Sequence, residues 1–215
     1  MSDELFLMLD TETANSIEDP FYYDLGFAVV DVKGEVYETA SFVNADIFLD
    51  DEMMSTAYFA DKIPQYWQDI KDGKRLLRRH STIRKAVRDV MRKYGITYVV
   101  AHNARFDYKS TNYTQRLLTS SKYRYFFPFG TKILDTLKMA REVLKSSESY
   151  RDFCKGNGFV CKNGTPRYTA EVIYRWLTGK VDFVESHTGL EDVLIEAKIF
   201  AFCRSINPDI DGLLW

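Results

Sequence analysis

The feature of this sequence that most constrains its fold is a short apolar run that ends in acidic side chains. Residues 5–9 are continuously apolar, and Asp10, Thr11 and Glu12 follow directly. An apolar run without polar alternation predicts a strand that is buried on both faces, as in the centre of an α/β sheet. Residues two apart in a strand point to one face, so Asp10 and Glu12 would project together if the strand continues through Thr11. The alternative is an acidic strand end that only leads into a turn.

Hydrophobic periodicity predicts further strands and helices along the whole chain. Apolar runs predict strands at residues 25–32, 35–43, 97–101 and 132–134, and Lys33-Gly34 predicts an antiparallel hairpin. Helical spacing predicts helices at residues 55–71, with Pro64 at a helix start, and at 79–94, 105–119, from 135 to about 145, 149–156, 169–178 and 189–204. Thr169 predicts a helix cap, and Thr188 with Glu191 predicts a capping box. We expect one α/β domain over residues 1–215, with a core at 5–204, extra C-terminal helices and a tail at 205–215.

Composition excludes several classes of protein. The 215 residues are 46% hydrophobic and 15% aromatic, with only 11 Gly and 5 Pro, which excludes a mainly disordered chain. No apolar run approaches the about 20 residues of a spanning helix, and the acidic start at Asp3 and Glu4 does not fit a secretory signal. We therefore expect no membrane association. Three cysteines without a CxxC pair predict free thiols in a reducing compartment, the cytoplasm.

Charge is distributed unevenly along the chain. The first 61 residues contain 15 acidic side chains and one basic side chain, so the remainder is strongly basic although the net charge is only −2. Residues 71–93 hold ten Lys and Arg against two Asp, and residues 105–127 interleave basic and aromatic side chains. This separation indicates a polyanion partner, a carboxylate cluster that holds cations, or two solvated faces of opposite charge.

Two later segments place polar residues at comparable positions. Residues 102–107 (His-Asn-Ala-Arg-Phe-Asp) follow the apolar run at 97–101, so Asp107 lies near the carboxyl end of a predicted strand. His187 precedes the last predicted helix, and Asp192 lies in its first turn. Ligands bind at the carboxyl ends of strands in open α/β sheets, which favours a functional site. Taken singly, each segment is also consistent with helix capping or with a favourable charge at a helix N-terminus.

Together the three segments match one known family in order and residue type. Asp-x-Glu on the first strand, Asn-x-x-Phe-Asp after a later strand and His-x4-Asp at the last helix resemble the three motifs of the DEDDh exonucleases. The segments 25–29, 133–136 and 163–167 are also similar to this family, and the resemblance covers residues 5–204. Within the family the chain most resembles the DnaQ-like proofreading epsilon subunit of bacterial DNA polymerase III and the phage and Gram-positive-type members.

The resemblance implies a ribonuclease H-like fold with a mixed five-stranded sheet flanked by helices. It implies a 3′–5′ exonuclease that releases nucleoside 5′-monophosphates from single-stranded or frayed DNA in replication or repair. The implied cofactor is a pair of Mg²⁺ ions, for which Mn²⁺ can substitute. The implied metal ligands are Asp10, Glu12, Asp107 and Asp192, and His187 is the implied general base. The expected substrate-binding residues are Thr11, Thr13, His102, Asn103 and Phe106. The expected partners are DNA 3′ ends and, beyond them, a DNA polymerase or sliding clamp.

The chemistry explains why these residue types suit the task. Carboxylate oxygens are the ligands that Mg²⁺ prefers, and two cations can stabilise the attacking and leaving oxygens of a phosphodiester. A histidine with an ordinary pKa near 6.5 can take a proton at neutral pH.

Several alternatives stay open at this level. The substrate can be RNA instead of DNA, or the chain can be a non-catalytic nucleic-acid-binding protein with the same fold. Cys154, Cys161 and His187 could suggest zinc, but their spacing fits no common zinc site. The apolar tail at 211–215 can dock on a partner such as a clamp or pack on its own domain. The sequence contains no GxxxxGK[ST], GxGxxG or serine nucleophile-elbow motif.

Overall fold

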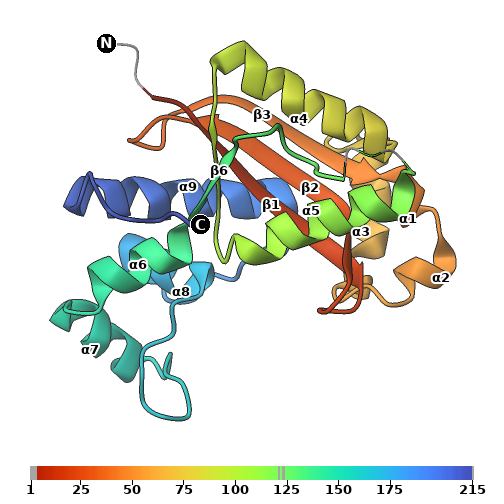
Figure 1. Ribbon diagram of the computed structural model, residues 1–215. Helices are drawn as coiled ribbons and strands as arrows, with labels where there is room; N and C mark the ends of the chain where they lie inside the picture. The colour runs from red at the N-terminus through yellow and green to blue at the C-terminus, as the bar shows by residue number, and fades with distance from the viewer. Residues whose placement is uncertain (1–3, 121, 123, 215) are drawn as a thin grey trace.

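One mixed sheet organises the computed structural model, which describes residues 4–120, 122 and 124–214 (Figure 1). Six strands pair in the order β4-β3-β2-β1-β5-β6. The strands are β1 (Phe6–Asn15), β2 (Pro20–Val30), β3 (Val36–Asn44), β4 (Leu76–Arg78), β5 (Tyr98–Ala101) and β6 (Lys132–Asp135). Strands β1, β2 and β3 are antiparallel neighbours, whereas β5 and β6 join β1 in parallel and β4 joins β3 in parallel. The predicted α/β class and the predicted hairpin are confirmed.

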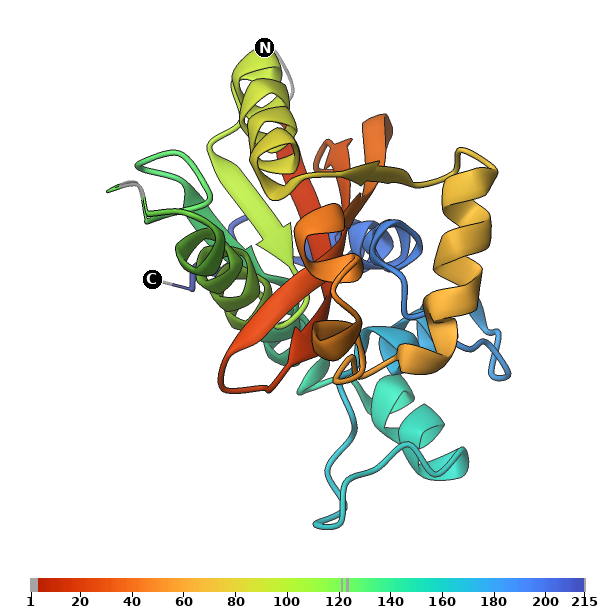
Figure 2. The same ribbon diagram turned by 90° about the vertical axis from the view of Figure 1, so that its right-hand side faces the viewer.

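Helices cover both faces of the sheet. They are α1 (Ala45–Phe48), α2 (Asp51–Met54), the 3₁₀ turn η1 (Ala60–Lys62), α3 (Ile63–Lys71), α4 (His80–Tyr94), α5 (Arg105–Leu118), α6 (Thr136–Leu144), α7 (Glu148–Gly156), α8 (Ala170–Thr178) and α9 (Gly189–Ile206). Helix α9 crosses one face with α6 and α8 beside it, and α4 and α5 lie on the other face (Figures 1 and 2).

The alternation of β1 assigns its side chains to the two faces. Phe6 and Met8 pack into the core under α6, α8 and α9, and Leu7 and Leu9 pack into the core under α4. Since side chains alternate along a strand, Asp10 and Glu12 continue the face of Phe6 and Met8, which is the α9 face. A shift in the pairing of β1 with β2 comes only after Glu12. The strand therefore carries both carboxylates out of the core on the same side, as predicted.

Two details of the predicted elements are corrected by the structure. The helix expected at 55–71 begins only at Ile63, because Pro64 lies in its first turn, where a missing N–H costs no hydrogen bond. Before it, the Ser55 and Thr56 hydroxyls bond to backbone carbonyls of the preceding turn, which competes with helix formation. The sheet also has a sixth strand at its edge, β4, in place of the five expected. Three residues are too few to show a period in the sequence.

The C-terminal tail packs on its own domain as far as the structure describes it. The Leu214 N–H donates to the Ile133 carbonyl (2.9 Å), and the Asp135 N–H donates to the Gly212 carbonyl (2.7 Å). The tail thus lies along β6, and the last residue of the expected docking segment, Trp215, lies outside the described residues.

Two further expectations concern membranes and thiols. Within residues 4–120, 122 and 124–214, no helix has both the length and the apolar character to cross a membrane. The three cysteines are free thiols, as predicted; Cys154 and Cys203 are buried and Cys161 is exposed.

Candidate active site

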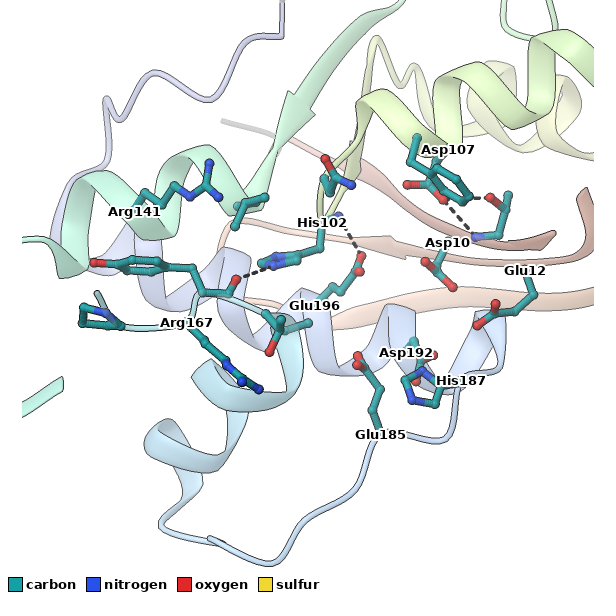
Figure 3. A pocket seen from close by; sticks show the side chains of 18 of the residues that line it. Asp10, Glu12, His102, Asp107, Arg141, Arg167, Glu185, His187, Asp192 and Glu196 are labelled. Atoms are coloured by element: carbon teal, nitrogen blue, oxygen red, sulfur yellow. Dashed lines mark hydrogen bonds between the residues drawn. The ribbon is translucent and has the colours of Figure 1, made fainter. Parts of the chain in front are cut away.

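A cleft of about 910 Å³ opens where the polar segments of β1, β5 and α9 meet (Figure 3). Nine of the ten residues named from the sequence line it: Asp10, Thr11, Glu12, His102, Asn103, Phe106, Asp107, His187 and Asp192. Thr13 is the exception and is not part of the cleft lining described. The structure therefore brings together three segments that lie about one hundred residues apart, as expected for neighbouring carboxyl ends of strands.

Two glycines bring α9 against the sheet. Gly26 of β2 pairs with Asp10 of β1, and a Cβ atom at Gly26 would lie 2.1 Å from the Leu190 backbone nitrogen. A Cβ at Gly189 would in turn lie 2.6 Å from the Gly26 nitrogen. The first turn of α9, which carries Asp192, can therefore approach the Asp10 backbone only because neither position has a side chain.

We expect Gly26→Ala to separate these elements and to reduce any activity of the cleft. The added methyl group meets backbone and not a flexible side chain, so α9 must shift, and overpacking of this kind costs roughly 1–3 kcal/mol of unfolding free energy. Thermal unfolding and activity should both be measured. Gly156→Ala in α7 is the matched control, because its Cβ meets nothing within 4 Å, and this variant should lose neither stability nor activity.

A buried polar network also fixes the start of α9. The Asp24 Oδ2 atom accepts hydrogen bonds from the Gly189 N–H (2.8 Å) and the Tyr66 hydroxyl (2.7 Å). The guanidinium of Arg75, only 2% exposed, lies 3.4 Å from Asp24 and donates to Glu191 (2.8 Å). Neither Asp24 nor Arg75 was singled out in the sequence. The network ties the loop before α9 to β2 and to the segment after α3.

The capping box predicted at Thr188 and Glu191 does not form. Instead of accepting from the helix backbone, the Thr188 hydroxyl donates to Glu191 Oε2 (2.8 Å), which Arg75 also engages. The Thr188 N–H donates to Asp192 Oδ2 (2.9 Å). Arg75 draws Glu191 away from its cap position, and Asp192 takes that role while it faces the cleft.

Asp107 is oriented by β1. Its Oδ1 accepts hydrogen bonds from the Thr11 N–H (3.0 Å) and the Thr11 hydroxyl (2.9 Å). Thr11 thus holds a carboxylate of α5 against the strand that carries Asp10 and Glu12. The side chains of Asp10 and Glu12 accept no hydrogen bond from any residue among those described, so both are available to a ligand in the cleft.

The carboxylates repel one another. Burial, with the charges of Asp24 and Asp192 among others, raises the pKa of Glu12 to about 9. Burial also raises the pKa of Asp107 and of Asp192 to about 7, although their hydrogen bonds act in the opposite direction. Burial and the neighbouring carboxylates raise the pKa of Asp10 as well. Such a cluster favours a bound cation, since a cation replaces repulsion by attraction.

The donor set fits a hard divalent cation. Glu12, His187 and Asp192 each offer a ligand atom, and these atoms lie within 4.8 Å of one another. This is the one candidate metal cluster among the described residues, and it contains no cysteine, which disfavours the zinc alternative built on Cys154 and Cys161. Carboxylate oxygens predominate across the cleft, and these are ligands that hard divalent cations prefer.

His187 is held in an unusual backbone conformation. Its φ of 53° lies in the left-handed region, and its ring stacks on Phe59 with centroids 4.3 Å apart and planes 10° apart. Burial lowers the pKa of this imidazole, so its neutral, proton-accepting form predominates at pH 7. The stacked ring faces the carboxylates of Glu12 and Asp192 (Figure 3).

His102 and Asn103 have mainly structural contacts. The His102 Nε2–H donates to the Tyr168 carbonyl (2.8 Å), so Nδ1 is left to accept from the Thr136 hydroxyl (3.0 Å). The Asn103 N–H donates to Asp135 Oδ1 (3.0 Å), and its φ of 64° turns the chain into α5. These contacts fix one wall of the cleft. Phe106, in the first turn of α5, also lines the cleft.

The cleft also contains residues that the sequence analysis missed. Glu185 and the buried Glu196 add two carboxylates, and Arg141 and Arg167 lie at the end of the cleft away from Glu12 (Figure 3). Glu196 follows Asp192 by four residues, so helical spacing alone placed both on one face and could have identified it. Arg167 ends the segment 163–167 that resembles the exonuclease family, but no site role was expected of it; Glu185 and Arg141 carry no comparable signal, because their segments reach the cleft only through the fold.

Comparisons with known proteins give a structural match only. No family model matches the sequence, and no curated protein matches it. The zinc-bound complex of E. coli exonuclease I with single-stranded DNA is similar with a TM-score of 0.62 and 15% identity, covering 95% of this chain and 41% of that one. Exonuclease I from Methylocaldum szegediense is similar with a TM-score of 0.58 and 14% identity, covering 96% and 41%.

The chain spans about two fifths of the length of the solved structures it matches. They are exonuclease I proteins and not the polymerase III epsilon subunit that the motifs suggested, so that closer resemblance has no support here. The chain has the ribonuclease H-like α/β fold of exonuclease I.

Proposed function

We propose that this protein is a cation-dependent 3′–5′ exonuclease that acts on single-stranded DNA and releases nucleoside 5′-monophosphates. The observation that supports it most is the convergence of Asp10, Glu12, Asp107, Asp192 and His187 in one cleft from three distant segments. The fold is that of exonuclease I, whose solved structures include complexes with oligonucleotides.

Each residue has a role in this proposal. Asp10, Glu12, Asp107 and Asp192 hold the divalent cations, with Glu185 and Glu196 close by in the same cleft. When bound, the cations neutralise the charge that develops on the phosphate and activate the attacking water. His187 accepts the proton of that water, because its neutral form predominates and Phe59 fixes its ring. Thr11 keeps Asp107 in place.

The other end of the cleft suits the rest of a nucleotide strand. Arg141 and Arg167 supply positive charge for phosphates there, whereas Phe106 supplies an aromatic face at the carboxylate end, near Asp107. We propose Mg²⁺ as the cation, with Mn²⁺ as a substitute, and a cytoplasmic role in replication or repair. A polymerase or sliding clamp as partner is part of the same proposal.

Digestion of labelled oligonucleotides tests the proposed function. With Mg²⁺, a 5′-labelled single strand should shorten progressively and a 3′-labelled strand should release a labelled mononucleotide at once. EDTA should abolish both results, because carboxylates alone do not neutralise a phosphodiester. Single-stranded DNA, duplex DNA and RNA should be compared in parallel. Faster digestion of RNA would favour the RNA-trimming alternative, and no digestion under any condition would favour a non-catalytic binding protein.

A further inference from the structure

A second groove lies on the face of the sheet that carries α4 and α5. Its volume is about 520 Å³, and it is bounded by α4, by Tyr108 of α5 and by residues 122, 124, 125 and 127–131 before β6. None of its lining residues lines the acidic cleft. Helix α5 separates the two, because Asp107 faces the cleft and the next residue, Tyr108, faces the groove.

The groove is strongly basic. Its lining contains Arg84, Arg88, Lys122 and Arg124 and no acidic side chain. Arg88 and Arg124 line the groove, and neither forms an ion pair with a described residue. The acidic residue nearest to Arg88 in α4, Asp89, is already paired with Lys85 and Arg92. The groove therefore presents positive charge that no described residue neutralises, which is complementary to a polyanion.

Two aromatic rings are exposed beside these charges. Phe129 is fully exposed (108%) and Tyr125 is 59% exposed. The segment that carries them is held in place, because the Arg84 guanidinium donates to the carbonyls of Phe126 (3.1 Å) and Tyr125 (2.9 Å). The segment thus offers the Phe129 ring to solvent, and beside it the Tyr125 ring, whose centroid lies 5.9 Å from the Arg116 guanidinium carbon.

We propose that this groove is a second binding site for single-stranded nucleic acid. Arg88 and Arg124 contact its phosphates, and Phe129 and Tyr125 stack on its bases. The strand is single because a duplex hides the base faces that exposed rings would contact. That the occupant is a strand of the enzyme's substrate rests on the proposed function. The positive charge and exposed rings of the groove do not depend on that function. A strand longer than the cleft can then be held at a point away from its reacting end.

Binding of a fluorescent oligodeoxythymidylate, measured by anisotropy in EDTA, tests this proposal without hydrolysis. Phe129→Ala should weaken binding about tenfold, and Phe129→Trp should preserve it, because stacking needs a ring at that position. The double variant R88Q/R124Q should weaken binding at low salt. It should also reduce the slope of log affinity against log salt by about 1.4, because each neutralised phosphate of a single strand contributes about 0.7 to that slope.

The control is the double variant K33Q/K155Q, which removes two exposed lysines that line neither the cleft nor the groove. It should bind like the parent, and hydrolysis of a dinucleotide should be unchanged in all groove variants. Unchanged binding in the groove variants would overturn the proposal. It would also be overturned if polyglutamate displaced the oligonucleotide as well as unlabelled oligonucleotide does and Phe129→Ala had no effect on binding. If binding depends on the groove but neither the parent protein nor any variant hydrolyses DNA, the proposed function fails and the groove assignment stands.

Discussion

Replacing Glu12 with glutamine is expected to abolish most nuclease activity and to stabilise the cation-free protein. The change removes a negative charge from a metal site, where a cation contributes several kcal/mol to the transition state. At about 1.4 kcal/mol per tenfold, the rate should fall about 10³-fold or more. Glu12 suits this test better than Asp107 or Asp192, because those carboxylates also accept hydrogen bonds that hold the backbone.

The expected gain in stability has a defined pH range. The pKa of Glu12 rises from 4.5 to about 9 on folding, so the folded state is penalised progressively as pH rises between these values. Glutamine does not titrate, so without cations Glu12→Gln should unfold at a higher temperature than the parent at pH 7. The difference should be on the order of 2–3 kcal/mol, which corresponds to roughly 5–10 °C.

Thermal unfolding with EDTA and with Mg²⁺, between pH 5 and pH 9, measures this effect. The parent should lose stability with rising pH in EDTA and recover it with Mg²⁺, and Glu12→Gln should respond less to both. The matched control is Glu142→Gln, an exposed carboxyl of α6 outside the cleft, which should change neither stability nor activity appreciably. A fully active Glu12→Gln variant would contradict the assignment of the site.

Replacing His187 with alanine is expected to slow hydrolysis by about 10²–10⁴-fold, the range for loss of a general base. Four carboxylates remain, so the stabilisation by Mg²⁺ should persist. The parent's rate should fall on the acidic side, because protonation removes the base. Burial lowers the pKa of His187, so this fall should lie below the ordinary histidine value of 6.5. The His187→Ala variant should not show this fall in rate at acidic pH.

Steady-state kinetics across pH, together with unfolding in Mg²⁺, separate this role from others. Added imidazole should restore part of the rate if the imidazole acts as a base. Loss of the Mg²⁺ stabilisation in His187→Ala would instead make His187 a metal ligand, which its position near Glu12 and Asp192 also allows. The control is Cys161→Ser, because Cys161 lines the cleft without a role in the proposed chemistry.

The sequence by itself determined five of the six strands, most helices and the three segments that reach the cleft. Its signals are local: the apolar run at 5–9 marks a buried strand, and the spacing of Ile83, Val87 and Val90 marks the buried face of α4. The acidic residues that interrupt such patterns at strand ends stand out for the same reason. Local periodicity also determined the position of Asp10 and Glu12 on one face of β1.

Only the tertiary structure decided how those segments meet. The contact between Gly26 and Gly189, the bonds from Arg75 to Asp24 and Glu191, and the approach of Glu185 and Arg167 to the cleft join residues far apart in the chain. The failed capping box shows the same effect, because a distant arginine outcompetes a local bond. Sequence periodicity reports which face of an element is buried, whereas these contacts depend on which elements become neighbours, and that is fixed only when the sheet and α9 pack.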